Sequence, residues 1–303
     1  MSNYNRNPLE DLRQFFSQRS MLAVLILINA GVWLLVKIAY VFSFLYAQPG
    51  SVSSNEWIMH FLAVPAYLPA LVSAPWSLLT YMFLHLDFWH ILFNMLWLYW
   101  FGRIFLEYLD QRKLVAVYLL GGICGAIVYV LSFNIFPVYK VILAESVAIG
   151  ASASVMAIVI AIAAYVPNYT INLLFIGRIR IIYVALVIFI LTSAVDFSVN
   201  SGGKLAHIGG ALFGYLFTLN IRKGRDIGKG INRIIDFFAT LFKPRSKMKV
   251  TYRKPATDYD YNKIKTEHQS RINHILDKIS KGGYDSLTKE EKDILFKESQ
   301  KKN

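Results

Sequence analysis

Six long apolar segments alternate along the chain with polar or aromatic segments. A helix needs roughly 20 consecutive, mostly apolar residues to cross a bilayer. The pattern therefore predicts six membrane-spanning helices, at about 21–46, 85–106, 114–136, 146–166, 180–198 and 203–221. The first follows twenty mostly polar residues without a convincing small-residue cleavage site, so we interpret it as a retained helix and not as a removed signal peptide.

The segment between the first two predicted helices, residues 47–84, is long and rich in Trp, Tyr, Phe and Pro. Amphipathic aromatic side chains favour the level of the lipid headgroups. The prolines break the segment too often for it to span. We therefore expect an outer loop that lies in the membrane interface.

After the sixth helix, Ile231, Ile234, Ile235 and Phe238 recur at helical spacing among Lys and Arg. This pattern predicts an amphipathic helix on the inner membrane surface, followed by a polar linker. Further on, an apolar helical stripe ends at Gly282-Gly283, and a capping box from Thr288 to Glu291 predicts a second helix.

Four parts are therefore expected. They are a cytoplasmic N-terminal segment (1–20), a six-helix membrane domain (21–222), a basic amphipathic and linker segment (223–262) and a cytoplasmic helical hairpin (263–303).

Composition supports an all-α, polytopic membrane protein. Hydrophobic residues make up 55% of the chain and charged residues 17%, and the mean hydropathy is positive, which a soluble fold would not tolerate. The single cysteine, Cys124, excludes a disulfide framework and a CxxC metal or redox site.

Charge is distributed unevenly. Residues 222–303 hold 21 Lys/Arg against 11 Asp/Glu, whereas residues 1–221 hold 11 against 8. Beside a membrane, such a tail pairs with anionic headgroups more simply than with nucleic acid. Lys and Arg also flank alternate ends of the predicted helices, and 47–84 contains neither. By the positive-inside rule, both termini are cytoplasmic in a multi-pass protein of the inner (cytoplasmic) membrane.

Polar side chains lie at one level in three of the predicted helices. Ser152, His207 and His90 each lie about five to seven residues from an outer helix end, which is roughly 10 Å deep for Ser152 at 1.5 Å per residue. Such intramembrane groups are costly and therefore indicate function. An imidazole can accept the proton of a serine hydroxyl and make it a nucleophile.

Small residues would let these helices approach closely. Gly202, Ala206, Gly210 and Gly214 recur every four residues in the sixth helix, and Gly150 and Ser154 form a similar pair in the fourth. No Asp or Glu is available at that depth to orient His207, because Asp87, Glu145 and Asp196 lie close to predicted helix ends, so the site would be a Ser152–His207 dyad.

Acyl transfer also needs donors for the oxyanion. His90 and Asn94 are spaced i, i+4 and share a helix face, so together with the Ser152 amide they would form an oxyanion hole. His85 is five residues from His90 and should point away from it, so it would support the loop or water structure and not the reaction.

Each residue alone also has a simpler interpretation. A serine in a membrane helix usually bonds to its own helix and serves packing. A lone histidine can be a proton relay or a metal ligand. Ser154 is a second candidate nucleophile, but it lies about 200° around the helix from Ser152, so both cannot face His207.

Three separated motifs carry a family resemblance: His85-x4-His90-x3-Asn94, Gly150-Ala151-Ser152, and Ala206-His207-x2-Gly210-x3-Gly214. With them the chain resembles the rhomboid intramembrane serine proteases. The resemblance implies that Ser152 is the nucleophile, His207 the general base and acid, and that His90, Asn94 and the Ser152 amide form the oxyanion hole. It implies further that 47–84 is a membrane-embedded loop and that the fifth helix is a movable gate.

The chain departs from the common pattern of that family at three positions. Ala153 stands where Gly is frequent, Met156 where Tyr is frequent, and Ser77 where Arg often follows the loop Trp. Because Ala is small enough for close backbone approach, we do not interpret Ala153 as a sign of an inactive enzyme.

The sequence thus predicts a serine endopeptidase that needs neither metal nor cofactor and that cleaves transmembrane substrate proteins near their outer ends. No HExxH and no pair of mid-membrane Asp is present for other intramembrane proteases. Two rivals remain: a catalytically silent rhomboid-like binder of transmembrane clients, and a small transporter. The oligomeric state stays open.

Overall fold

The structure is a computed structural model that describes residues 20–46, 54–173, 177–195, 200–241 and 258–300. The chain forms two compact units, Met1–Phe242 and Lys243–Asn303. Of the expected segments, 1–20 lies almost entirely outside the described residues, and so does much of the expected linker, 242–257.

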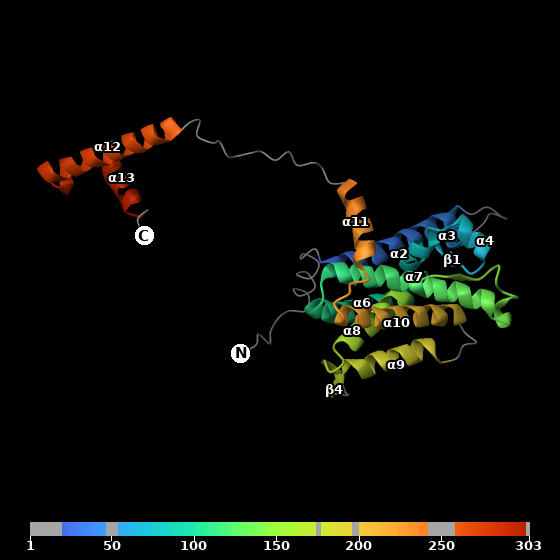
Figure 1. Cartoon of the computed structure of the whole chain (residues 1–303). Coiled ribbons are helices and arrows are strands. Elements are labelled where there is room, and N and C mark those ends of the chain that lie inside the picture. The colour runs from blue at the N-terminus through green and yellow to red at the C-terminus, as the bar shows by residue number, and fades with distance from the viewer. Residues whose placement is uncertain (1–19, 47–53, 174–176, 196–199, 242–257, 301–303) are drawn as a thin grey trace. The chain divides into compact units, whose positions relative to one another are not determined.

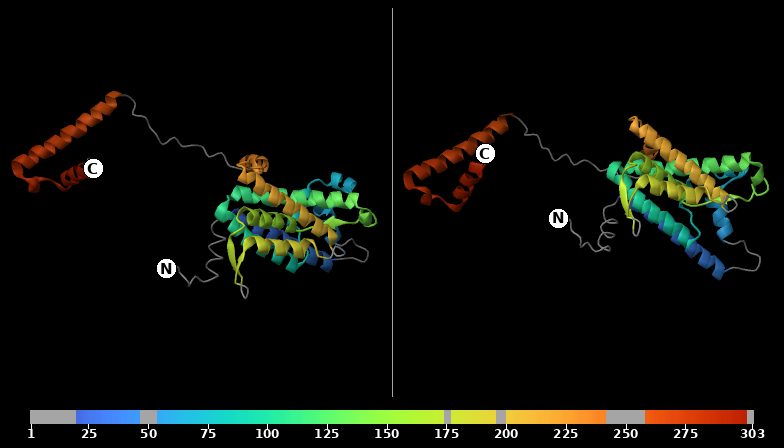
Figure 2. Two further views of the ribbon diagram at one scale, coloured as in Figure 1. Left: turned by 60° about the horizontal axis from the view of Figure 1, so that its bottom comes forward. Right: turned by 90° about the horizontal axis from the view of Figure 1, so that it is seen from below.

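The bundle helices of the first unit run side by side (Figure 1). They are α2 (Met21–Leu45), α6 (Phe88–Tyr108), α7 (Gln111–Ile135), α8 (Ser152–Tyr165), α9 (Ile181–Ser193) and α10 (Ser201–Arg222). Helix α8 contacts α6, α7, α9 and α10 and lies at the centre, as two further views also show (Figure 2).

Polar residues begin three of these helices. Ser20 accepts a hydrogen bond from the Ala23 N–H, Asp110 accepts one from the Lys113 N–H, and Asn200, in left-handed conformation, accepts one from the Gly203 N–H. These bonds satisfy backbone donors that have no partner within the helix. The apolar runs that follow can then continue as helix.

The loop between α2 and α6 forms short elements and no long helix. In order they are α3 (Ser54–Leu62), β1 (Val64–Pro65), α4 (Leu68–Ser73), α5 (Ser77–Thr80) and the 3-10 turn η1 (Tyr81–Phe83). Strand β1 pairs antiparallel with β2 (Val147–Ala148), which directly precedes the α8 region. The loop is therefore fixed to the segment that carries Ser152.

Helix α8 begins later than the sequence predicted. We expected a helix over 146–166, but the chain is extended at β2 and turns at Gly150 before α8 begins at Ser152. The assumption of seven helical residues before Ser152, on which its predicted depth rested, was therefore wrong. Gly150 and Ser154 are likewise not a pair on one helix.

By length and apolarity, two described helices qualify as membrane spans, α2 and α7, while α8 and α9 are apolar but shorter. Ten of the fourteen α8 residues are buried. A helix enclosed by protein can be shorter than the bilayer, because irregular backbone at membrane depth is tolerated where neighbouring protein covers it.

Small residues bring α8 and α10 into backbone contact. A Cβ on Gly210 would lie 2.1 Å from the Ala153 carbonyl oxygen, and one on Gly214 would lie 2.2 Å from that of Ala157. The neighbouring Gly209 packs against Cys124 and Gly125 of α7. This part of the predicted small-residue face is therefore the seam between the helices.

Two further elements lie in the first unit. The strands β3 (Thr170–Leu173) and β4 (Gly177–Arg180) form an antiparallel hairpin before α9. Helix α11 (Lys229–Leu241) follows α10 and runs crosswise to the bundle helices (Figure 1).

The second unit is a helical hairpin of α12 (Asp258–Gly282), the turn η3 (Tyr284–Ser286) and α13 (Lys289–Gln300). Helix α12 begins within the segment we expected to be linker. The predicted capping box is confirmed: the Thr288 N–H donates to Glu291 at 2.8 Å, and the Glu291 N–H lies 3.4 Å from Thr288 Oγ1. Ile275 and Leu287 are its buried apolar residues.

Candidate active site

Ser152 is the first residue of α8, and its side chain is half-buried. The preceding turn is held by two backbone donors: the Gly150 N–H bonds the Tyr81 carbonyl at 2.9 Å, and the Ala151 N–H bonds His85 Nε2 at 3.2 Å. The first N–H groups of a helix have no acceptor within the helix and carry its positive dipole. Ser152 therefore lies where developing negative charge is stabilised.

Gly150 has φ of +110°, a conformation that favours glycine. A Cβ added there would lie 2.7 Å from Cε1 of His90. The turn before Ser152 thus passes directly against the His90 ring, and this contact brings α6 and α8 together at the candidate site.

His85 precedes α6 and is completely buried. Because Nε2 accepts the Ala151 N–H, the proton of a neutral His85 ring must lie on Nδ1, which is 3.4 Å from the Phe83 carbonyl. The ring also lies edge-on to His90, with 5.1 Å between centroids. We expected His85 to point away from His90, and in this the prediction was wrong, because His85 is not in the helix.

Asn94 lies on the same side of α6 as His90. Its Nδ2 donates to the His90 carbonyl at 2.9 Å and lies 3.4 Å from His85 Nε2, and the side chain is buried. One of its two N–H groups is thus only loosely engaged and can turn to another acceptor.

His207 lies in the second turn of α10. Its Nδ1 is 3.1 Å from the Thr192 carbonyl in the last turn of α9, where carbonyls have no partner within the helix. A carbonyl can only accept, so the proton lies on Nδ1 and Nε2 is left as a base.

The contact between α8 and α10 involves residues that lie close in sequence to Ser152 and to His207. Gly210, one turn after His207, touches Ala153, the residue after Ser152. Ser154 lies elsewhere: it is fully buried, with its Oγ 3.8 Å from Met82 Sδ and facing Gly122 of α7. Met156, one helical turn beyond Ser152, is also buried.

A polar network behind the site was missed at the sequence level. Asn29 Nδ2 of α2 donates to Tyr118 Oη of α7 at 2.9 Å, and Tyr118 Oη donates to the Met82 carbonyl at 3.1 Å. Next to Met82, the Tyr81 hydroxyl donates to the Gly122 carbonyl at 2.5 Å. The signal available in the sequence was Asn29, an amide inside an apolar run.

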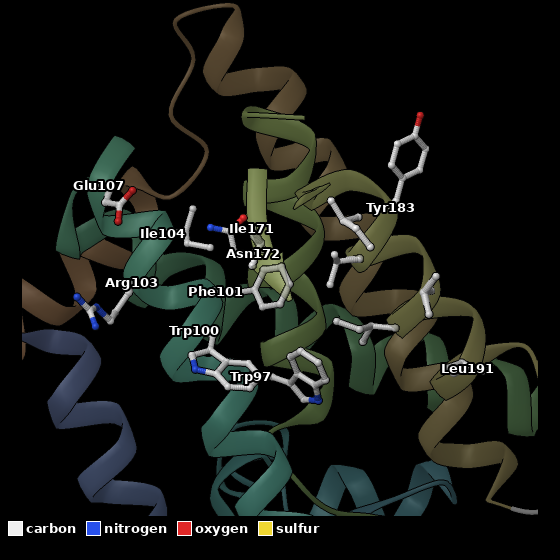
Figure 3. Close-up of a pocket in the computed structure, with 14 residues that line it drawn as sticks. Trp97, Trp100, Phe101, Arg103, Ile104, Glu107, Ile171, Asn172, Tyr183 and Leu191 are labelled. Atoms are coloured by element: carbon white, nitrogen blue, oxygen red, sulfur yellow. The ribbon is translucent and has the colours of Figure 1, made fainter. Parts of the chain in front are cut away.

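A cavity of about 800 Å³ opens between α6 and α9 (Figure 3). Trp97, Trp100, Tyr183 and Leu191 contribute to its mostly apolar lining, and Arg103, Glu107 and Asn172 are polar residues at its edge. Its shape and chemistry suit an apolar chain segment.

Fold and site together define a class: an α-helical bundle in which a buried histidine and a half-buried one contact the turn that precedes a serine at a helix N-terminus. The family described as Rhomboid domain matches residues 73–224, about half of the chain. The chain belongs to the rhomboid family, a family of intramembrane serine proteases, and is an integral membrane protein.

The C-terminal hairpin matches a second family. Residues 256–301 correspond to a family of unknown function, DUF6576. No curated protein matches the chain.

Proposed function

We propose that the chain is an endopeptidase that hydrolyses peptide bonds in or next to transmembrane helices of membrane proteins, with Ser152 and His207 as a catalytic dyad. The observation that carries the proposal is the turn at Gly150-Ala151, which is held by His85 and His90 and sets Ser152 at the start of α8. The contact of Gly210 in α10 with Ala153, the residue after Ser152, supports a site shared by the motifs of α6, α8 and α10.

In this mechanism Ser152 Oγ attacks the substrate carbonyl carbon while His207 Nε2 takes its proton. The Thr192 carbonyl holds the other ring nitrogen and does part of what a carboxylate does in a triad. His90, the loosely engaged Asn94 amide and the Ser152 N–H stabilise the oxyanion. His207 then gives the proton to the leaving amine. In the second half of the reaction, His207 takes a proton from water, which attacks the acyl carbon, and then gives this proton to Ser152 Oγ as the acyl bond breaks.

All six bundle helices would span the membrane, with both termini cytoplasmic and the site open to the outer face. The distribution of Lys and Arg supports this orientation. The first turn of α6, which carries His90, and the second turn of α10, which carries His207, belong to the end expected to face outward.

Substrates would enter between α6 and α9, where the cavity offers apolar walls. An intact helix hides its carbonyls in its own hydrogen bonds, so cleavage would require helix-weakening residues near the outer surface of the substrate.

A fluorophosphonate probe tests the nucleophile in the folded protein. We expect the parent chain to be labelled and Ser152→Ala to be unlabelled. Ser154→Ala is the matched control and should remain labelled, because that hydroxyl faces α7. Absence of labelling in the folded parent would favour a silent rhomboid-like binder of transmembrane clients.

Cleavage of a reporter transmembrane segment tests the other roles. His207→Ala should abolish cleavage, and Asn94→Ala should slow it by up to about 10²–10³-fold, the usual effect of losing one oxyanion donor. Full activity of His207→Ala would refute the dyad.

A further inference from the structure

Helix α11 carries apolar and basic side chains on different faces. At 100° per residue, Ile231, Ile234 and Ile235 fall within one arc, and Lys229 and Arg233 fall outside it. The Ile234 side chain is 53% exposed, and Ile231 and Ile235 are half-buried. The protein itself covers this apolar arc only in part, so another apolar surface can pack against the rest of it.

Contacts with α7 fix the position of α11. Gly228 is buried against Ala116, and Asp236 forms an ion pair with Arg112 at 3.3 Å. Both Ala116 and Arg112 lie in the first turns of α7, so α11 begins at the end of the bundle where α7 begins and α10 ends. From there it runs crosswise to the bundle helices in Figure 1, which for an integral membrane protein is the direction of the membrane plane.

The charges beside α11 are complementary to anionic lipid. Lys223, Arg225, Lys229 and Arg233 are exposed. The two acidic residues of this stretch are engaged, since Asp226 accepts the Gly228 N–H at 2.8 Å and Asp236 pairs with Arg112. These four cations and Arg112 outnumber the two carboxylates, so the electrostatic potential beside α11 is positive.

We infer that α11 is an interfacial helix that inserts its isoleucine arc into the leaflet at which α10 ends and binds anionic phospholipid headgroups through the flanking Lys and Arg. The apolar arc supplies insertion and the cations supply preference for charged lipid, each cation contributing roughly fivefold in affinity near such a surface. This binding needs the membrane bundle alone and does not depend on peptide-bond cleavage.

An environment-sensitive fluorophore tests the orientation of the full chain in nanodiscs. In a Cys124→Ser background, Ile234→Cys labelled with NBD should show blue-shifted emission and protection from aqueous iodide. Thr240→Cys, an exposed position on the polar side of the same helix, is the matched control and should be quenched freely. Equal quenching at both positions would overturn the inference.

Lipid composition tests the charge preference. Protection at position 234 should increase when phosphatidylglycerol is added to phosphatidylcholine nanodiscs, and Lys229→Gln with Arg233→Gln should remove most of the increase. Protection that ignores phosphatidylglycerol would refute anionic lipid as the ligand. Protection that depends on protein concentration in detergent would assign the arc to a second copy of the chain and would also refute it.

Discussion

At the scale of single residues, Gly150 joins two requirements: a positive φ and room for the His90 ring. Gly150→Ala should strongly reduce cleavage, because the methyl group must displace His90 in addition to straining the backbone, itself a cost of about 1–3 kcal/mol.

Gly177→Ala separates these two effects in the same assay. Gly177 also has positive φ, at +91°, but an added Cβ there meets nothing within 4 Å. It should lower thermal stability modestly and leave the cleavage rate almost unchanged. Equal loss of cleavage in both variants would show that the His90 contact is unimportant.

His85 should act by positioning the turn before Ser152. His85→Leu leaves the Ala151 N–H without its acceptor, a cost of about 1–3 kcal/mol, which would lower kcat by roughly tenfold to a hundredfold if it falls on the transition state. His85→Gln places an oxygen near the Nε2 position and should restore part of kcat.

Steady-state kinetics on the reporter segment distinguish this role from a general packing role. KM should change little in either variant, since the substrate would bind between α6 and α9. A loss of kcat that Gln does not rescue at all would argue against the hydrogen bond as the cause.

The residues proposed for the site were accessible to sequence reasoning because side-chain chemistry and spacing are written in the chain. The Thr192 contact was not, since it uses a backbone carbonyl whose availability depends on where α9 ends. The role of His85 was also obscured, because an assumed helix over 85–106 turned its ring away from His90.

At the scale of elements, hydrophobic runs located the bundle helices well but placed the start of α8 too early. Val147 and Ala148 are apolar enough for a helix, yet they pair with Val64 and Pro65 of the outer loop. A tertiary pairing thus overrides the local pattern. The consequence for the site is large, because Ser152 becomes a helix N-terminal residue with a free amide.

The Asn29–Tyr118–Met82 network should stabilise the packing of α2, α7 and the outer loop. Tyr118→Phe removes the hydroxyl from buried partners and should lower stability by about 1–3 kcal/mol, measured as thermal unfolding in detergent. Tyr183→Phe, whose ring is 56% exposed, is the control and should change stability little.

Asn29→Leu provides the second side of a double-mutant cycle. Combined with Tyr118→Phe, it replaces both polar partners, so the double variant should be less destabilised than the sum of the two. Additive effects would contradict a direct interaction between these side chains.

At the scale of the whole molecule, the positive charge is concentrated between the bundle and the C-terminal hairpin. Residues 222–257 hold 11 Lys/Arg and 2 Asp/Glu, while residues 258–303 hold 10 and 9. The basic surplus therefore belongs to the stretch after the bundle, and the hairpin is nearly neutral. The hairpin could be predicted from the sequence because a helix cap and a glycine break each depend on a few neighbouring residues. Its biological role is not encoded in a short motif of this kind.

The hairpin should be sensitive to acid. Hydrogen bonds from Thr288, assisted by Lys278, lower the pKa of Glu291 from 4.5 to about 2. Because the pKa of Glu291 is lower in the folded chain than in the unfolded chain, its carboxylate stabilises α13 fully at pH values above about 4.5. This contribution is lost as the pH falls from about 4.5 towards 2.

Hydrogen exchange of α13 in the full chain can measure this loss. Exchange should accelerate, beyond its intrinsic pH dependence, as the pH falls through that window. Glu291→Gln keeps a capping acceptor without the titrating charge, so its α13 protection should be lower at neutral pH and nearly flat with acid. A parent chain whose α13 protection does not change across the window would contradict the assignment.

The Thr192 carbonyl belongs to α9, one wall of the cavity through which a substrate would enter. If α9 moves aside to admit a substrate, His207 loses its hydrogen bond to the Thr192 carbonyl for as long as the entrance is open. Substrate entry and proton transfer by His207 could then not take place at the same time. His207 would be held ready as a base only after the substrate has bound and α9 has returned to its place.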